Sequence, residues 1–274
     1  MYLVQAYGTE PFVLAETEDY AVVYKPPFIH SVPLKKTEGE KPLPGFPTLL
    51  DWYGRIRKEA LEVSGRKEWE GGLLHRLDYE TEGLVLIAKN QSAMDAILAR
   101  QEQGLFVKEY GAVSSSPGAA CSPLPGFPPS PQDSGRSVPS PIKSYFRPWG
   151  PGRRAVRPVV TEPGLLREKQ RRNIAADQGK PYITEVLETE DLGETFVYFR
   201  LRIKRGFRHQ IRCHLSWIGS PILNDGLYGG MILHGGAVAL RAEGFSFYDP
   251  ASGEKREYRI PPLSAPAIFK GVCL

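Results

Sequence analysis

The chain has 274 residues, of which 41% are hydrophobic and 24% charged, a composition typical of globular proteins. No segment approaches the ~18 consecutive apolar residues of a membrane-spanning helix, and the N-terminus lacks the pattern of a signal peptide, so we expect a cytoplasmic protein. The 3 cysteines form no Cys-x-x-Cys pair, which argues against a disulfide framework or a zinc site. A net charge of +4 is too mild to indicate nucleic-acid binding by itself.

The first predicted element is a strand at residues 20–24, a β-rich run that ends just before two prolines. Residues 33–47 are rich in proline, glycine and lysine and are expected to form a loop. Thr48 then begins a predicted helix that ends near Ser64 and Gly65. The apolar face of this helix consists of Leu49, Tyr53, Ile56 and Ala60.

The next stretch is the most informative part of the sequence, because it places Asp78 between a basic pair and a predicted buried strand at residues 84–88. His75 and Arg76 form the basic pair. They supply hydrogen-bond donors and a positive charge, which suit an ionised carboxylate and a nearby phosphate. Taken alone, the pattern favours an aspartate that merely holds a turn.

Ser92 has the position of a helix cap, and Gly104 is expected to end the helix that follows. A strand at about residues 105–113 comes next and carries Lys108 and Tyr110. Because alternate residues of a strand lie on one face, this pair can present one cation and one aromatic ring to one nucleotide. A tyrosine standing alone here would instead indicate a half-buried core residue.

Residues 114–141 differ in composition from the rest, with many prolines among serines and glycines. We expect a flexible, partly extended insertion. Its length exceeds what a compact domain needs between two strands, so disorder and a role in binding a partner both stay open.

A hairpin is predicted from residues 181–188 and 195–204. In its second strand apolar residues alternate with polar and cationic ones, so one face belongs to a core and the other is basic. A helix follows over about residues 207–219, in which Arg208 and Arg212 lie one turn apart. Its apolar face consists of Ile211, Leu215 and Ile218.

Two stretches are strongly basic. Residues 195–224 hold no acidic side chain, and their cations are Arg200, Arg202, Lys204, Arg205, Arg208 and Arg212. Residues 143–172 hold Glu162 and Glu168 against Lys143, Arg147, Arg153, Arg154, Arg157, Arg167, Lys169, Arg171 and Arg172. Such clusters are expected on a surface that follows a phosphate backbone, although the second fits a solvated face equally well.

The stretch His75-Arg76-Leu77-Asp78, with Thr81, Gly83 and Ala88-Lys89 after it, resembles the catalytic signature of the RluA-type RNA pseudouridine synthases. Lys25-Pro26 and the Lys-x-Tyr motif that ends at Tyr110 are also similar to motifs of this family. A later family motif is matched in order by Gly206, His209-Gln210-Ile211-Arg212, His214-Leu215, Ile218-Gly219, Pro221-Ile222, Asp225 and Tyr228-Gly229.

Two positions depart from the family pattern. Glu82 stands where serine is usual, and we expect it to lie in a turn with little effect on the chemistry. Phe207-Arg208 stands where arginine followed by threonine or serine is usual, which moves the basic group by one residue.

The resemblance implies a role for each of three residues. Asp78 is the expected nucleophile, Arg212 is expected to pair with it, and Tyr110 is expected to stack on the target base and to act as a general base. Contacts with RNA are expected from His75, Arg76, Lys108, Arg208 and His209. Arg76 is also placed to fill the gap that a flipped uridine leaves.

The resemblance also implies an α+β fold with a long, mixed, mostly antiparallel sheet, flanking helices and a central RNA-binding cleft. We expect residues 1–274 to form one catalytic domain, interrupted by the insertion, without an S4-type RNA-binding domain. The implied reaction is isomerisation of specific uridines in structured RNA, ribosomal or transfer, and it requires neither a cofactor nor a metal. The protein is expected to act as a monomer without an obligatory protein partner.

Two other functions are weighed against this one. A catalytically silent RNA-binding protein of the same fold is disfavoured because Asp78, Tyr110 and Arg212 are all present. A metal-dependent hydrolase would use His75, Asp78, His209 and His214. It is remote, because residues five apart in a helix, such as the last two histidines, lie about 140° apart around the axis.

Overall fold

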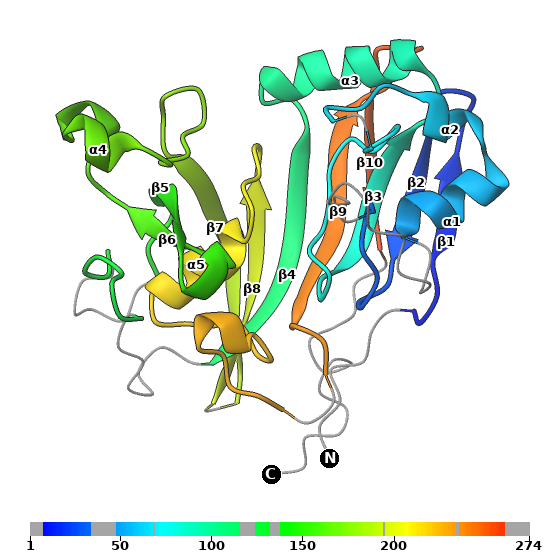
Figure 1. Ribbon diagram of the computed structural model, residues 1–274. Helices are drawn as coiled ribbons and strands as arrows, with labels where there is room; N and C mark the ends of the chain where they lie inside the picture. Colours follow the sequence, from blue (N-terminus) through cyan, green and yellow to red (C-terminus); the bar gives the residue numbers. More distant parts are fainter. Residues whose placement is uncertain are drawn as a thin grey trace. The chain divides into compact units, whose positions relative to one another are not determined.

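The computed structural model describes residues 8–33, 48–67, 69–115, 124–131, 138–193, 195–233 and 236–260. These residues form two compact units, and each is considered by itself (Figure 1). The Asp78 unit contains the described parts of residues 8–108 and 241–260, and the Arg212 unit contains those of residues 109–240. A single catalytic domain stays a prediction.

The Asp78 unit is built on five strands: β1 (Phe12–Glu16), β2 (Tyr20–Lys25), β3 (Glu82–Ala88), β9 (Leu240–Tyr248) and β10 (Lys255–Arg259). β2 pairs antiparallel with β1 and β3, β10 pairs antiparallel with β9, and β3 pairs parallel with β9. Every residue of β2 and β3 is buried, as expected for strands covered on both faces. The predictions of a strand at residues 20–24 and of a buried strand at 84–88 are therefore confirmed.

Three helices belong to this unit: α1 (Leu49–Ile56), α2 (Glu59–Glu62) and α3 (Gln91–Glu102). Thr48 caps α1 as predicted, and its side chain and that of Asp51 form a reciprocal capping box. The prediction of one continuous helix is wrong, because Arg57 is extended at φ −138° and ψ 93° and ends α1. Ile56 is consequently exposed.

The cap of α3 also differs from the prediction. Asn90, and not Ser92, is the N-cap, since its Oδ1 accepts a hydrogen bond from the Ala93 amide at 2.9 Å. Ser92 already lies inside the first turn, where its side chain cannot reach the amides that need a cap. Gly104, at φ +75°, follows the helix as predicted.

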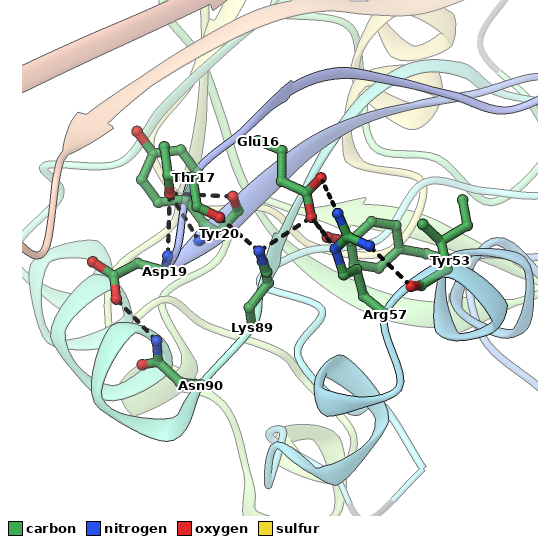
Figure 2. Close-up of polar contacts among 9 residues, drawn as sticks. Glu16, Thr17, Asp19, Tyr20, Tyr53, Arg57, Lys89 and Asn90 are labelled. Atoms are coloured by element: carbon green, nitrogen blue, oxygen red, sulfur yellow. Dashed lines mark hydrogen bonds and ion pairs between the residues drawn. The ribbon is translucent and has the colours of Figure 1, made fainter.

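Polar side chains tie α1 to the sheet of the Asp78 unit (Figure 2). The Glu16 carboxylate, at the end of β1, accepts hydrogen bonds from Tyr53 Oη at 3.0 Å and from Arg57 Nε at 2.8 Å. Lys89 Nζ lies 3.1 Å from the same carboxylate and donates to the Thr17 carbonyl at 2.7 Å. One acidic residue thus joins a strand, a helix and the end of the stretch that carries Asp78.

The Arg212 unit holds most of β4 (Val107–Ser115) together with β5 (Ile142–Trp149), β6 (Ala155–Val159), β7 (Tyr182–Leu192) and β8 (Phe196–Ile203). The order is β4-β8-β7-β5-β6, and β7 pairs antiparallel with β8 in the predicted hairpin. Alternate residues of β8 are buried, which confirms the predicted core face. The remaining elements are η1 (Pro151–Arg153), η2 (Pro163–Leu165), α4 (Glu168–Arg171), α5 (Gln210–Trp217) and η3 (Gly226–Tyr228).

α5 is shorter than predicted, and all of its residues are buried. The Phe207 amide donates to Gln210 Oε1 at 3.0 Å, and His209 is left-handed at φ +54°, so a turn precedes the helix. Arg208 lies in this turn. The prediction that Arg208 and Arg212 share a helix face is therefore wrong.

Part of the proline-rich insertion is packed against the Arg212 unit. Leu124 and Phe127 contact the cluster around the buried Phe146, and Trp217 Nε1 donates to the Pro128 and Pro129 carbonyls, each at 3.1 Å. Residues 124–131 are therefore packed, and not flexible as composition predicts for the insertion. Residues 116–123 and 132–137 of the insertion lie outside the described residues. The same holds for most of the predicted loop at 33–47.

The fold class agrees with the prediction: the chain is α+β, and its described residues contain ten strands in a mixed, mostly antiparallel arrangement. Within the part of the chain that the structure describes, no helix is long and apolar enough to cross a membrane. The RNA-binding cleft stays a prediction.

Candidate active site

Asp78 lies in a short loop whose backbone is fixed on both sides. The Leu77 amide donates to Ser31 Oγ at 3.1 Å, and the Ser31 hydroxyl donates to the Leu77 carbonyl at 2.9 Å. On the other side, the Thr81 amide donates to the Asp78 carbonyl at 3.1 Å and closes a turn. Asp78 itself is half-buried. The loop therefore presents a carboxylate from a rigid backbone.

Lys25, at the end of β2, is completely buried behind this loop. Its ammonium donates to the carbonyls of Pro26 and Ile29 at 2.9 Å each and to that of Tyr79 at 3.4 Å. Burial lowers the pKa of Lys25 to about 7, while the nearby carboxylates of Asp78, Glu80 and Glu82 oppose this shift. The sequence shows Lys25 only as part of a shared motif, and its role as an anchor comes from these contacts.

His75 supports the loop from the core side. Its Nε2 accepts a hydrogen bond from the Leu86 amide at 3.2 Å, and its ring meets the edges of Phe106 and Phe245. Burial, together with the cation of Lys108, lowers the pKa of His75 well below its usual value, so the imidazole is neutral. The predicted contact of His75 with RNA stays a prediction.

Arg76, the next residue, is exposed. Its Nη1 lies 2.9 Å from Oε1 of the nearly buried Glu70. This ion pair holds one side of the guanidinium, and 48% of the Arg76 side chain is still exposed to solvent. The predicted role of Arg76 toward a flipped uridine stays a prediction.

Glu82, the unusual residue of the motif, does not lie in a turn as predicted. It is the first residue of β3, is buried, and is aligned with Arg241 of the parallel strand β9. Its Oε1 accepts from Arg241 Nε at 2.7 Å, and its Oε2 accepts from the Tyr24 hydroxyl. Burial and the Glu82 carboxylate raise the pKa of Tyr24, so the phenol keeps its proton. Glu82 is thus the acceptor that a buried arginine requires.

Lys108 and Tyr110 both lie on β4 and are both buried. The Lys108 ammonium lies 5.3 Å from the centroid of the Phe106 ring, and burial lowers its pKa to about 8. Their spacing places the two side chains on the same face of the strand. Stacking of Tyr110 on a base stays a prediction.

Arg212 lies in the middle of α5 and is held by a two-point ion pair. Its Nε donates to Asp225 Oδ2 at 2.7 Å and its Nη2 to Asp225 Oδ1 at 2.8 Å, and both side chains are buried. The guanidinium also lies 5.6 Å from the centroid of the Tyr228 ring. This fork sets the direction of the whole guanidinium plane. Sequence reasoning placed Asp225 in the shared motif but gave it no role.

The two residues before α5 make contacts that shape the start of the helix. Arg208 Nη2 donates to the carbonyls of Arg153 and Ala155 at 2.9 and 3.1 Å, and His209 Nδ1 lies 3.2 Å from the Tyr228 hydroxyl. Their contacts with RNA stay predictions. Asp78 belongs to one unit and Tyr110 and Arg212 to the other, so their predicted meeting around one uridine also stays a prediction.

Comparisons with known proteins agree with the motifs. A model of the RNA pseudouridylate synthase family matches residues 19–217. The uncharacterized RNA pseudouridine synthase YjbO of Bacillus subtilis (strain 168) is 26% identical over 260 residues, which cover 94% of this chain and 75% of that protein. Ribosomal large subunit pseudouridine synthase D of Vibrio vulnificus (strain CMCP6) is 28% identical over 204 residues. That match covers 69% of this chain but only 52% of the Vibrio protein.

A solved structure has the same fold. Human RNA pseudouridylate synthase domain containing 1 matches with a TM-score of 0.57 and 18% identity, covering 95% of this chain and 87% of that one. At this identity the likeness shows the fold alone. Because the family model covers well over half of the sequence, as the motifs predicted, the chain belongs to the RluA-type RNA pseudouridylate synthases, a family of isomerases.

Proposed function

We propose that this chain converts specific uridines of a structured RNA to pseudouridine, with Asp78 as the nucleophile. The observation that carries the proposal is the Asp78 loop: its backbone is hydrogen-bonded on both sides, and its carboxylate lies within a family motif that departs from the usual pattern at Glu82. A nucleophile held in this way loses little conformational freedom when it meets its substrate.

The proposed reaction is an isomerisation, so atoms and electrons balance without a second substrate. The bond from the ribose to N1 of uracil breaks, the ring turns and C5 of uracil joins the ribose. The base removes the C5 proton, and N1 takes up a proton, so the product is an isomer of uridine. The chain has to supply a nucleophile, a cation to keep it ionised and a base for the C5 proton. We assign these roles to Asp78, Arg212 and Tyr110, in that order.

The surroundings of these residues support the assignment. The Lys25 side chain lies behind the Asp78 loop and holds it through the carbonyls of Ile29 and Tyr79. The fork with Asp225 holds Arg212 in one orientation, which a directed ion pair with a nucleophile needs. Tyr110 is buried on β4, so its ring is ordered before a base arrives.

The basic residues support RNA as the substrate, although some of them are paired with acidic residues of the same chain. Arg202 of β8 lies 2.9 Å from Glu109 and 3.7 Å from Glu185, and Arg200 lies 3.6 Å from Glu188. Part of the charge of this strand is therefore neutralised within the protein. We propose that the exposed Arg76 and Arg208 contribute phosphate contacts, together with His75, Lys108 and His209 at shorter range.

Replacement of Asp78 by asparagine tests the proposal. The assay measures tritium release from RNA labelled at C5 of uridine. The variant should release no tritium while RNA binding stays near that of the wild type, because the shape and the backbone contacts of the loop are kept. The matched control is Asp95→Asn, an exposed aspartate of α3 in the same unit, which should leave the rate unchanged.

Full activity of Asp78→Asn would refute the mechanism, and inactivity of the wild-type protein on all cellular RNA would favour a silent RNA-binding protein. The choice between ribosomal and transfer RNA is made by mapping pseudouridines in total RNA from cells with and without the gene. One of the relatives is named for the ribosomal large subunit, and the proposal covers either class until this map is made.

A further inference from the structure

An exposed aromatic cluster adjoins the Asp78 loop within the Asp78 unit. The Tyr79 ring centroid lies 4.7 Å from that of His30 and 5.9 Å from that of Phe28. The exposed fractions of Phe28 and Tyr79 are 47% and 41%. Large aromatic side chains gain most by burial, so a cluster of rings left in water needs an explanation other than folding.

The arrangement requires an unfavourable backbone conformation at Phe28. Its φ is +64°, in the left-handed region that a bulky side chain adopts only at a cost. The Phe28 amide donates to the Tyr79 carbonyl at 2.7 Å, and the buried Lys25 ammonium holds the carbonyls of Ile29 and Tyr79. The two loops that carry the rings are therefore joined, and the rings are placed before any ligand arrives.

The backbone of His30, which carries the third ring of the cluster, is also held. The His30 carbonyl accepts a hydrogen bond from the Leu49 amide at 2.8 Å, at the first residue of α1. Burial, with the nearby Lys25 cation, lowers the pKa of His30, so its ring is neutral near pH 7. A neutral imidazole beside Tyr79 extends the aromatic surface without adding a charge.

We propose that Phe28, His30 and Tyr79 form a stacking platform for an RNA base next to the target uridine. This inference rests on the proposed function. Tyr79 directly follows Asp78 in the chain, so a base on the platform lies one or a few nucleotides from the reacting uridine. Extrusion of a uridine breaks its stacking with its neighbours, and an aromatic surface replaces the contact that the neighbour loses.

A hairpin RNA with one loop uridine, flanked on both sides by 2-aminopurine, is the probe. Stacking of 2-aminopurine on an aromatic ring quenches its fluorescence, and the titration also gives the Kd. Phe28→Gly removes the ring and suits the positive φ, so we expect this variant to fold, and Tyr79→Ala removes the second ring. Tyr79→Phe keeps the ring, and Ile56→Ala removes an apolar side chain of similar exposure, 45%, from α1.

Phe28→Gly and Tyr79→Ala should each weaken binding by about tenfold and abolish the quenching, because base–aromatic stacking contributes at that level. Tyr79→Phe and Ile56→Ala should stay within about twofold of the wild type. Equal quenching in all proteins, or none in the wild type, would overturn the platform.

The test separates this inference from the proposed function. Tritium release by the wild type together with quenching that is insensitive to both substitutions would refute the platform and leave the enzyme activity standing. Quenching that both substitutions abolish, without tritium release, would support the platform and refute the activity. If the two substitutions weakened binding of another protein and left the RNA quenching unchanged, that result would also count against the platform.

Discussion

Removal of the buried ion pair between Glu82 and Arg241 should measurably lower the free energy of unfolding. Arg241→Met keeps much of the side-chain volume but removes both charged donors from Glu82. The exposed fractions of the two side chains are 5% for Arg241 and 6% for Glu82, so water cannot replace the lost cation. The carboxylate would then be buried without its arginine, although the Tyr24 hydroxyl still donates to it and the Lys25 side chain lies nearby.

Removal of one partner from a buried ion pair costs about 3–5 kcal/mol, because an uncompensated charge stays behind. Tyr24 still donates to Glu82 in the variant, so we expect the lower end of the range, about 3 kcal/mol. A loss of 1 kcal/mol lowers the midpoint of thermal unfolding by about 2–4 °C in a chain of this size, which predicts a fall of about 6–12 °C.

Urea titration followed by circular dichroism measures the free energy of unfolding. The control is Arg256→Met in the same unit, where an exposed arginine lies 3.1 Å from Glu254. Exposed pairs contribute little, so the control should lose less than about 1 kcal/mol. If Arg241→Met lies within about 1 kcal/mol of the wild type, the ion pair is not the stabilising contact that its burial implies.

Two further predictions concern Lys25 and Gly83. Burial holds the pKa of Lys25 at about 7 in the folded chain, against 10.5 for a free lysine, so the unfolded chain binds more protons between these values. The free energy of unfolding should therefore rise with pH from 7 to 10 by up to ~1.4 kcal/mol per pH unit. Urea titrations at each pH measure this rise, which the Lys25→Met variant should lack. If the wild type and the variant show the same dependence on pH, the prediction is wrong. Gly83 has φ +128°, and a Cβ there would lie 2.3 Å from the Ala242 carbonyl oxygen. Gly83→Ala should cost about 3 kcal/mol or more, whereas Gly164→Ala, with nothing within 4 Å, should be neutral; equal thermal midpoints would refute the steric argument.

Local patterns explain what could be predicted without a structure. Some features depend only on neighbours within a few residues, so the sequence is enough to predict them. They are the alternation in β8, the Thr48 cap and the buried strand β3. Asp78 was identified from the family motif around it, since the basic pair before it and the strand after it, taken alone, favour an aspartate that holds a turn. Element ends were less certain, as Arg57 and Asn90 show, because several residues nearby could serve as stop or cap.

Contacts between distant residues could not be predicted. The partner of Glu82 lies 159 positions away, on the strand beside β3, and nothing near Glu82 in the chain indicates a buried cation. The same holds for the role of Lys25, whose contacts with the Asp78 loop depend on how β2 lies against it. Glu82, which the sequence predicts in a turn, is therefore a buried hydrogen-bond acceptor in the structure.

The amino-acid sequence by itself determined the family, the fold class and the proposed nucleophile, because each of these is expressed in motifs of adjacent residues. The tertiary structure alone decided that Glu82 is paired with Arg241, that Lys25 anchors the loop, and that Phe28 and Tyr79 stand exposed beside Asp78. The physical reason is that burial, ion pairing and ring contacts depend on distances in space, which the chain establishes only when it folds.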